Sequence, residues 1–388
     1  MSKRTKKTDT VELDPDSERK VTDFLTYPEL GSVRTTRKRD RERKYSMDMD
    51  TIDITGRKRV TTELFQLYHT NRVTKILAGG SNINIHLLQF IAKHCPMLVH
   101  LNISGCPITN IDALKDCKML STLDLNGCKN ITDISALAQC TQLSTLNLSY
   151  CNRITDISAL AQCTNLSYLD LSGCSITNID ALAQCTHLSE LNLSNCPITD
   201  ISALGENLLR LGLYNCKKIT DISALRTCTK LYTLNLSRCK NITDISALET
   251  CTKLSHLSLN GCEKITDIYA LGKCTQLSDL ILRGCEKITD ISALETCTKL
   301  SHLSLRGCIN IADIRALAQC TELSYLDLSF CKNITDISAL ATCKKLETLD
   351  LRGTKVQDIW KRKIDDAQAF FDREIRVQLP TQLSRLRF

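Results

Sequence analysis

The fold can be worked out from residues 131–151, ITDISALAQCTQLSTLNLSYC, because nearly the same phrase returns along most of the chain. Within it, Leu143, Leu146 and Leu148 alternate with polar residues, which is typical of a short strand with one apolar side. The segment ISALAQC, which comes before them, has the composition of a short helical or 3-10 segment. A single coil of this kind cannot bury its apolar side, whereas stacked copies can. The sequence therefore predicts a repeat solenoid.

The repeat pattern L-x-x-L-x-L occurs twelve times, at steps of 22 or 23 residues with one step of 20. The copies start at Leu98, Leu120, Leu143, Leu166, Leu188, Leu208, Leu231, Leu254, Leu277, Leu300, Leu323 and Leu346. Two weaker copies are expected before them, in IDITGRKRVTTELFQLY from Ile52 and in VTKILAGGSNINIHLLQFIAKHCPML from Val73. Both the period and the phrase L-x-x-L-x-L-x-x-C resemble the leucine-rich repeats.

The resemblance covers residues 52–354 and implies an α/β fold. We expect a leucine-rich-repeat solenoid, a curved horseshoe with a parallel β-sheet on the concave face and short helical or 3-10 segments on the convex face. Thr132 and Asp133 are expected to cap the turn before the convex segment. One copy, ISALGENLLRLGL from Ile201, lacks its convex cysteine and about three residues, which predicts a kink or a tighter coil.

The 22 cysteines follow the repeat, since all lie between Cys95 and Cys343 and none forms a C-x-x-C motif. In each copy the first cysteine, such as Cys151, ends the strand pattern, and the second, such as Cys140, ends the convex segment. We predict buried thiols that fill space; disulfides or a metal site are the alternative. So many thiols would be a liability in an oxidising compartment, so we expect the cytoplasm or the nucleus.

The strand residues that face away from the core are the candidate binding surface, because they project in parallel columns free of packing. Most are Ser, Thr or Asn. The exceptions include the residue types enriched at interface hot spots, and we predict that they bind a protein partner: Tyr168, Glu190, Arg210, Tyr214, His256, Asp279, Arg283, His302, Arg306, Tyr325 and Phe330. The alternative is that they are merely tolerated surface residues.

Three of these residues form a sharper cluster. His256, Asp279 and His302 occupy the same column in three consecutive copies, so that Asp279 should lie about 5 Å from each histidine. The row could bind a charged partner, satisfy itself by hydrogen bonds or hold a metal, although parallel side chains suit metal geometry poorly. Our hypothesis is that the carboxylate favours protonated histidine and makes binding depend on pH.

Composition excludes several functions. The net charge of +7, from 50 basic and 43 acidic residues, is too mild and spread out to indicate nucleic acid, and the aromatic content of 4% leaves few stacking surfaces. No run reaches the roughly 18 apolar residues of a membrane helix, and the N-terminus has no signal-peptide pattern. Motifs such as H-E-x-x-H, G-x-S-x-G and G-x-x-x-x-G-K are absent. We expect a monomeric binding protein that is not an enzyme and needs no cofactor.

The first 51 residues are expected to form a basic, partly disordered region, which contains the run VRTTRKRDRERK. Within residues 13–41, LDPDSERKVTDFLTYPELGSV resembles the F-box, with Leu13, Val21, Phe24, Leu25, Leu30 and Val33 on its apolar positions. It departs from the family at Ser17–Arg19, which are polar where the F-box is apolar, and at Asp40, where Trp is usual. The resemblance implies docking on a Skp-type adaptor, as in the F-box receptors whose cysteine-containing leucine-rich repeats this chain resembles.

The chain is also similar to bacterial internalins, in which ITDISAL recurs, but the lack of a signal peptide and the many cysteines disfavour an exported protein. From the F-box resemblance we expect an F-box-like substrate-recognition subunit of a cullin-RING (SCF-type) ubiquitin ligase. The alternative is a structural or regulatory scaffold of the flagellar, cytoskeletal, phosphatase-regulating or cyclase-regulating kind. Residues 355–388 are predicted to be a helical cap, because Trp360, Ile364, Ala367 and Phe371 recur at helical spacing.

Overall fold

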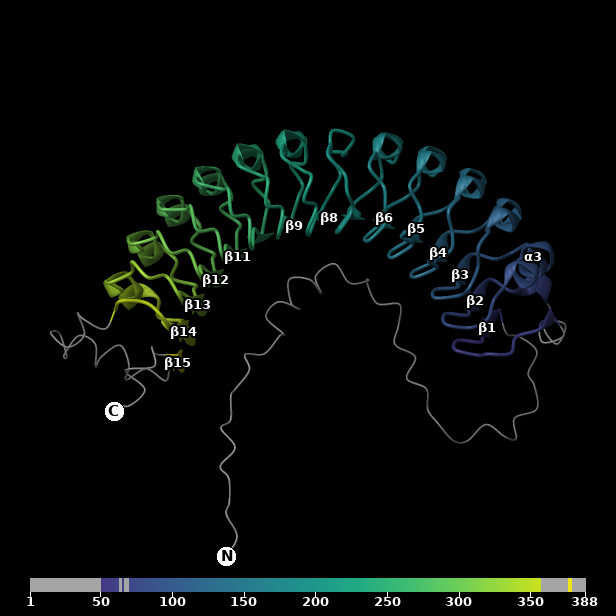
Figure 1. The fold of residues 1–388 in the computed structure, drawn as a ribbon, viewed down its shortest axis with the longest axis horizontal. Coiled ribbons are helices and arrows are strands. Elements are labelled where there is room, and N and C mark those ends of the chain that lie inside the picture. Colours follow the sequence, from purple (N-terminus) through teal and green to yellow (C-terminus); the bar gives the residue numbers. More distant parts are fainter. Residues whose placement is uncertain (1–49, 63–64, 66–69, 357–375, 379–388) are drawn as a thin grey trace, which may run out of the picture. The chain divides into compact units, whose positions relative to one another are not determined.

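The computed structural model describes residues 50–62, 65, 70–356 and 376–378. In this part of the chain, 15 strands form one sheet in sequence order (Figure 1). Each neighbouring pair is parallel, as shown for example by β5 and β6. The predicted parallel solenoid is therefore confirmed.

All strands are three residues long, and the two weaker copies predicted before Leu98 are confirmed as β1 and β2. The strands are β1 (Thr51–Asp53), β2 (Lys75–Leu77), β3 (His100–Asn102), β4 (Thr122–Asp124), β5 (Thr145–Asn147), β6 (Tyr168–Asp170), β7 (Glu190–Asn192), β8 (Arg210–Gly212), β9 (Thr233–Asn235), β10 (His256–Ser258), β11 (Asp279–Ile281), β12 (His302–Ser304), β13 (Tyr325–Asp327), β14 (Thr348–Asp350) and β15 (Arg376–Gln378).

The segments on the other side of the coils are mainly 3-10 helices, and the α-helix α3 (Ile85–His94) lies near the start. They are η1 (Thr70–Arg72), η2 (Asp112–Asp116), η3 (Ser135–Gln139), η4 (Ser158–Gln162), η5 (Asp180–Gln184), η6 (Ser223–Thr227), η7 (Ser246–Thr250), η8 (Tyr269–Lys273), η9 (Ser292–Thr296), η10 (Arg315–Gln319) and η11 (Ser338–Thr342). Within the repeats, Figure 1 shows the strands on the concave side and the helical segments on the convex side.

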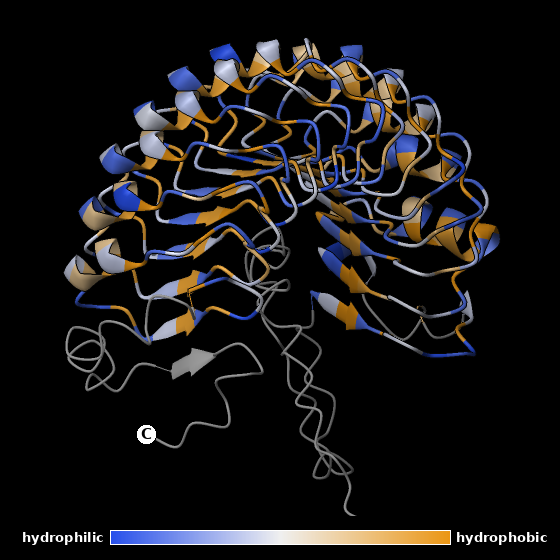
Figure 2. Ribbon diagram, turned by 60° about the vertical axis from the view of Figure 1, so that its left-hand side comes forward, coloured by the Kyte–Doolittle hydropathy of each residue, from blue (hydrophilic) through white to orange (hydrophobic). Residues whose placement is uncertain are grey.

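The leucines of the repeat explain why the coils stack. Leu143, Leu146 and Leu148 are fully buried between the strand and the 3-10 segment, and the same holds in the neighbouring coils. In Figure 2 hydrophobic and hydrophilic residues alternate along the strands and coils of successive repeats. Backbone bonds link successive coils, for example from the Leu148 amide to the Asp170 carbonyl at 2.8 Å. Each coil thus supplies the burial and the hydrogen bonds that its neighbour needs.

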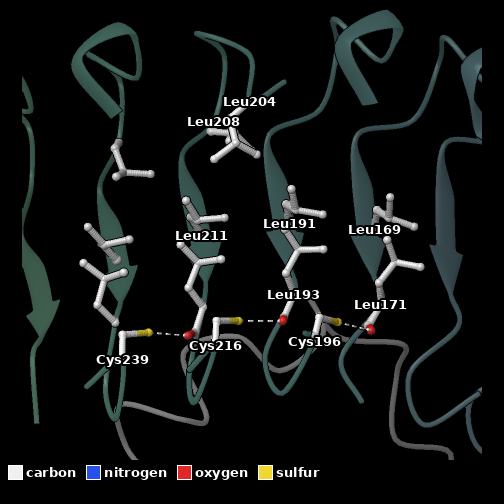
Figure 3. Packing of buried hydrophobic residues seen from close by; sticks show 14 of the residues in the cluster. Leu169, Leu171, Leu191, Leu193, Cys196, Leu204, Leu208, Leu211, Cys216 and Cys239 are labelled. Carbon is white, nitrogen blue, oxygen red and sulfur yellow. Dashed lines mark hydrogen bonds between the residues drawn. The ribbon is translucent and has the colours of Figure 1, made fainter. Parts of the chain in front are cut away.

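The cysteines form two columns of buried thiols, and all 22 are free. In the column at the strand ends, each sulfur donates to a carbonyl of the preceding coil, as Cys196 does to Leu171 at 3.1 Å and Cys216 does to Leu193 at 3.1 Å (Figure 3). In the convex column, Cys163 donates to the Leu137 carbonyl at 3.3 Å. The geometry supports the predicted packing role, because the sulfurs are buried and most of them also donate to a carbonyl of the preceding coil.

The aspartate of ITDI shapes the turn before each 3-10 segment. The Oδ1 atom of Asp133 accepts a hydrogen bond of 2.7 Å from the Ser135 amide, and Asp244 accepts one of 2.7 Å from the Ser246 amide. Ile134 stands at the N-cap position and makes no side-chain cap bond. The predicted turn role of Asp133 is confirmed. Asp133 lies two residues before Ser135, where the 3-10 segment begins.

The copy that begins at Ile201 forms the tighter coil predicted for it. Between β7 and β8 no 3-10 segment occurs, although the part of the chain around it is fully described. The sulfur of Cys228 lies 3.6 Å from the Gly205 carbonyl, where other convex cysteines reach a leucine carbonyl. The column of convex segments is therefore interrupted between η5 and η6.

Only some of the predictions for the two ends of the chain concern residues that the structure describes. The F-box-like segment 13–41 and the helical spacing from Trp360 to Phe371 lie outside the described residues. Residues 376–378 form β15, which pairs with β14, so these three residues are a strand where a helical cap was predicted. No helix in residues 50–356 has the length and apolar character to span a bilayer.

Candidate functional site

Many of the Ser, Asn and Asp side chains on the strand face form hydrogen bonds with one another. The Oδ1 atom of Asn147 accepts bonds from the amide and the hydroxyl of Ser149, at 2.9 and 2.6 Å. Asp327 accepts the same pair of bonds from Ser329, at 2.9 and 2.6 Å. These side chains are buried and end the strand in a local turn. They hold the coil together and leave recognition to the residues that differ from this pattern.

The predicted His-Asp-His column is present. His256 pairs in register with Asp279, Asp279 with His302, and His302 with Tyr325. The rings of His302 and Tyr325 stack with centroids 5.8 Å apart and an interplanar angle of 16°. The column from β10 to β13 therefore combines two histidines, a carboxylate and a phenol on consecutive strands.

The electrostatics of the column differ from our hypothesis. Burial lowers the pKa of His256, and the charges of Arg210 and His302 lower it further. Burial raises the pKa of Asp279, although His302 opposes this shift. The direction of the His256 shift is opposite to our hypothesis, because its causes are burial and nearby positive charge. The dependence of binding on pH stays a prediction.

Arginine side chains stack on aromatic rings at the C-terminal ends of the strands. The guanidinium of Arg306 lies 5.1 Å from the centroid of Phe330, and that of Arg238 lies 5.4 Å from the centroid of Tyr214. Phe330 stands in the turn with φ of +62°, one residue beyond the strand-face columns to which it was assigned. It is exposed at the rim of the face, so its predicted contact with a partner would come from this edge.

Two of the other predicted residues form a pair, and one is poorly accessible. Arg210 and Glu190 make an ion pair of 3.2 Å across neighbouring strands. Tyr168 is only 9% exposed, so it offers a partner little surface. The predicted residues thus concentrate in the coils from β8 to β13, whereas Tyr168 and Glu190 lie outside this group on β6 and β7.

The geometry can be compared with known proteins. The family model for leucine-rich repeats (two copies) matches residues 96–139, 118–162, 164–206, 206–250, 298–342 and 321–362, which together cover more than half of the chain. This protein belongs to the leucine-rich-repeat family. The matching model describes a repeat, and it does not describe a catalytic domain.

Among solved structures, the internalin InlF of Listeria monocytogenes superposes on this leucine-rich-repeat protein with a TM-score of 0.67 and 27% identity, covering 82% of this chain and 88% of that one. A leucine-rich-repeat protein of Leptospira interrogans gives 0.58 and 19%, covering 86% and 96%. The plant peptide hormone receptor RGFR1, solved in complex with RGF2, gives 0.54 and 17%, covering 76% and 53%. The last two show the fold alone. No curated protein sequence matches the chain.

The leucine-rich repeats also present residues that sequence reasoning missed. Leu209 and Tyr232, which come just before β8 and β9, are 43% and 44% exposed, and the Tyr232 ring lies 5.1 Å from that of His256. Both occupy the second position of the repeat, where most copies have Ser. This difference from the usual Ser was the sequence signal by which the two residues could have been identified. Arg238 was missed because it stands in the turn, where most copies have Gly.

Metal ligation finds no support in the described coils. Nowhere in residues 50–62, 65, 70–356 and 376–378 do three or more His, Cys, Asp or Glu side chains gather as metal ligands. The thiols are also poor ligands, because burial raises the pKa of Cys151 to about 12 and that of Cys274 to about 12. The arrangement as a whole offers side chains for contact with a large partner.

Proposed function

We propose that this leucine-rich-repeat protein is a non-enzymatic interaction module that binds a protein partner on its concave face. The observation that carries the proposal is the replacement of the self-bonded Ser, Thr and Asn floor by Arg, His and Tyr in the coils from β8 to β13. Tyrosine and arginine supply large contact areas and directed hydrogen bonds, and they dominate interface hot spots. The peptide complex of the plant receptor supports a binding role for the same fold, without identifying the partner.

The proposal is tested with the double variant Arg283→Glu plus Tyr325→Ala, which changes one charge and one ring on the concave face. Partners are captured from extracts of the source cells with the full chain and identified by mass spectrometry. The matched control is Lys273→Glu plus Tyr269→Ala, which makes the equivalent changes on η8 of the convex side. We expect the concave variant to lose the partners that the control retains. Equal loss or equal retention would place the interface elsewhere.

At the finer level, we propose that the protein acts as an F-box-like substrate receptor of a cullin-RING ligase. Support comes from the sequence of residues 13–41 alone, where Val21, Phe24 and Leu25 are spaced for one helical face. In this proposal the segment docks on a Skp-type adaptor and the concave face holds the substrate. Cytoplasm or nucleus is the compartment we propose.

The adaptor proposal is tested by co-precipitation of a Skp-type adaptor with the full chain. Leu25→Asp places a charge on the apolar face of the expected helix and should abolish co-precipitation. Thr26→Asp is the matched control, since it introduces the same charge at the next residue, off that face. Absence of the adaptor from the wild-type precipitate would retire the ligase role and leave the interaction module standing.

A further inference from the structure

We infer that the concave face takes an extended protein segment rich in carboxylates, recognised by a row of arginines at the C-terminal ends of β9 to β12. The inference rests on the proposed function, since it specifies the partner of the same face. The row consists of Arg238, Arg283 and Arg306, and the name arginine row is used for these three residues below.

Two arginines of the row lie over aromatic rings, and this arrangement favours the binding of an anion. A guanidinium that lies on an aromatic ring uses its face for that contact and keeps its N–H groups in the plane, where they can meet a carboxylate in two parallel hydrogen bonds. Arg306 on Phe330 and Arg238 on Tyr214 have this arrangement. Neither guanidinium has an ion-pair partner within the described coils. The two arginines are therefore held in place while their donors remain available.

The charges around the row also favour an acidic partner. In each coil, the seventh and eighth residues of the repeat are the last strand-face position and the turn position after it. From β7 to β14 these two positions contain no acidic residue and four arginines: Arg238, Arg283, Arg306 and Arg352. Arg352 is already paired with Asp350, at 2.6 Å. Two carboxylates of these coils are also engaged, since Asp327 is buried and bonded to Ser329, and Glu263 pairs with Lys240 at 2.7 Å. Arg238 and Arg306 thus present positive charge that forms no ion pair within the described coils.

The spacing of the row points to an extended segment that crosses the strands. Arg283 and Arg306 stand on neighbouring coils, since the Gly284 amide donates to the Arg306 carbonyl at 2.8 Å. Arg238 lies three coils before Arg306, which is roughly 14 Å at the usual distance between strands. An extended chain advances about 3.3 Å per residue, so carboxylates four residues apart on one side would reach both.

The test uses a rhodamine-labelled peptide of alternating Glu and Thr, about twelve residues long so that it spans roughly 40 Å when extended. Binding to the full chain is measured by fluorescence anisotropy, beside peptides of alternating Gln and Thr and of alternating Lys and Thr. We expect the Glu peptide to bind best and its affinity to fall as salt is raised. A Glu peptide that binds no better than the Gln peptide overturns the inference.

The variant Arg238→Gln plus Arg306→Gln should weaken binding of the Glu peptide about tenfold, since it removes two charge-assisted contacts. Arg226→Gln plus Arg315→Gln is the matched control, because it removes the same charge from the convex segments η6 and η10. Circular dichroism confirms that both variants fold. Equal affinity of the two variants contradicts the role of the row.

Two further probes separate other anions from carboxylates. A peptide with phosphoserine in place of Glu, or a single-stranded oligonucleotide of the same length, that binds more than tenfold tighter overturns the choice of a carboxylate-rich segment. If partners depend on Arg283 and Tyr325 but not on Arg238 and Arg306, the proposed function stands and the acidic segment is wrong. Loss of partners in both concave variants, with binding of the Glu peptide, supports both proposals.

Discussion

At the residue scale, burial decides the chemistry of the cysteines. The Cys151 sulfur is completely buried, lies 3.1 Å from the Leu125 carbonyl, and has a pKa raised by burial to about 12. Since the thiolate is the reactive form, a shift of this size lowers its population at pH 8 about a thousandfold. The thiols are therefore part of the core, and their number carries no implication of catalysis or redox chemistry.

We predict that 5,5′-dithiobis(2-nitrobenzoic acid) reacts slowly with the native protein at pH 8 and with all 22 thiols after denaturation without reductant. The reason is that both access and thiolate formation require the coils to open. The measurement is the absorbance of released thionitrobenzoate. A denatured count well below the full number would show disulfides and would contradict the packing role, together with the compartment proposed above.

A second prediction separates packing from hydrogen bonding at Cys151. Cys151→Ala leaves a small cavity and removes one of the two hydrogen bonds to the Leu125 carbonyl, which keeps the bond from the Cys128 amide at 3.0 Å. It should cost about 1–2 kcal/mol of unfolding free energy. Cys151→Val restores most of the volume without the donor, so it should cost less than Ala. Urea unfolding followed by circular dichroism measures both. If Val costs as much as Ala, the bond to the Leu125 carbonyl outweighs packing.

The sequence allowed the role of the cysteines to be predicted because each one follows the repeat, and position in a repeat determines burial. The sequence did not allow the exposure of Tyr168 or the position of Phe330 to be predicted. Tyr168 has a strand-face position, yet the side chains around it cover all but a small part of its surface. Phe330 stands one residue after the strand face, in a turn whose backbone conformation the letters alone do not reveal. The exposure of a single side chain depends on the residues that surround it in the fold, and the repeat pattern of the sequence does not identify those residues.

At the element scale, the turn after each strand has a requirement that few residues meet. Gly173 has φ of +74°, a region that other residues enter at a cost of roughly 1 kcal/mol or more. A Cβ atom there would also lie 3.0 Å from Cδ1 of Tyr150, whose ring comes from the turn of the preceding coil. In the same way, Gly353 follows Phe330 of the preceding coil in this column.

We predict that Gly173→Ala lowers the midpoint of thermal unfolding, because the backbone conformation is unfavourable and the Tyr150 ring must move. Gly205→Ala is the control, since a Cβ atom there would meet nothing within 4 Å. It should leave stability unchanged or raise it slightly by restricting the unfolded chain. Differential scanning calorimetry compares the two variants. Equal midpoints would show that the turn tolerates a side chain at position 173.

The elements that the sequence predicted are those defined by periodicity. The alternation of leucines located β1 to β14, and the short ISAL segment indicated helical or 3-10 structure at η2 to η11. The α3 helix was not foreseen as an α-helix, because its run from Ile85 to His94 stands in a weak copy of the repeat. Its start is established by Asn84, whose side chain accepts from the Leu87 amide at 3.0 Å. β15 was missed because no leucine pattern precedes it.

At the scale of the whole molecule, each coil depends on its two neighbours, so a weak coil is a local event. The coil between β7 and β8 is such a place, since it lacks the 3-10 segment that links the convex layer elsewhere. The Leu204 amide still reaches the Ile201 carbonyl, at 3.1 Å. This coil has no convex cysteine of its own, so that turn is supported by the Cys228 sulfur of the next coil, which lies 3.6 Å from the Gly205 carbonyl.

We predict that amides of residues 201–207 exchange with deuterium faster than those of residues 245–251, the corresponding part of a complete coil. The physical reason is that local opening costs less where fewer packed groups must separate. Hydrogen exchange with mass spectrometry of peptides from the native protein measures both segments. Equal protection would show that the shorter coil is as well supported as the others.

The register of the sheet has a consequence for how such a binding face can arise. The segment Ile242–Leu259 is identical to Ile288–Leu305, two coils further along. Copying two coils by unequal recombination therefore delivers His256 and His302 to the same column, on either side of Asp279. Because the parallel strands pair in register, the copied side chain reaches the surface without any compensating change in the core. Gene duplication alone can lengthen or repeat a recognition column in this protein, and point mutation then needs to alter only the letters that face the partner.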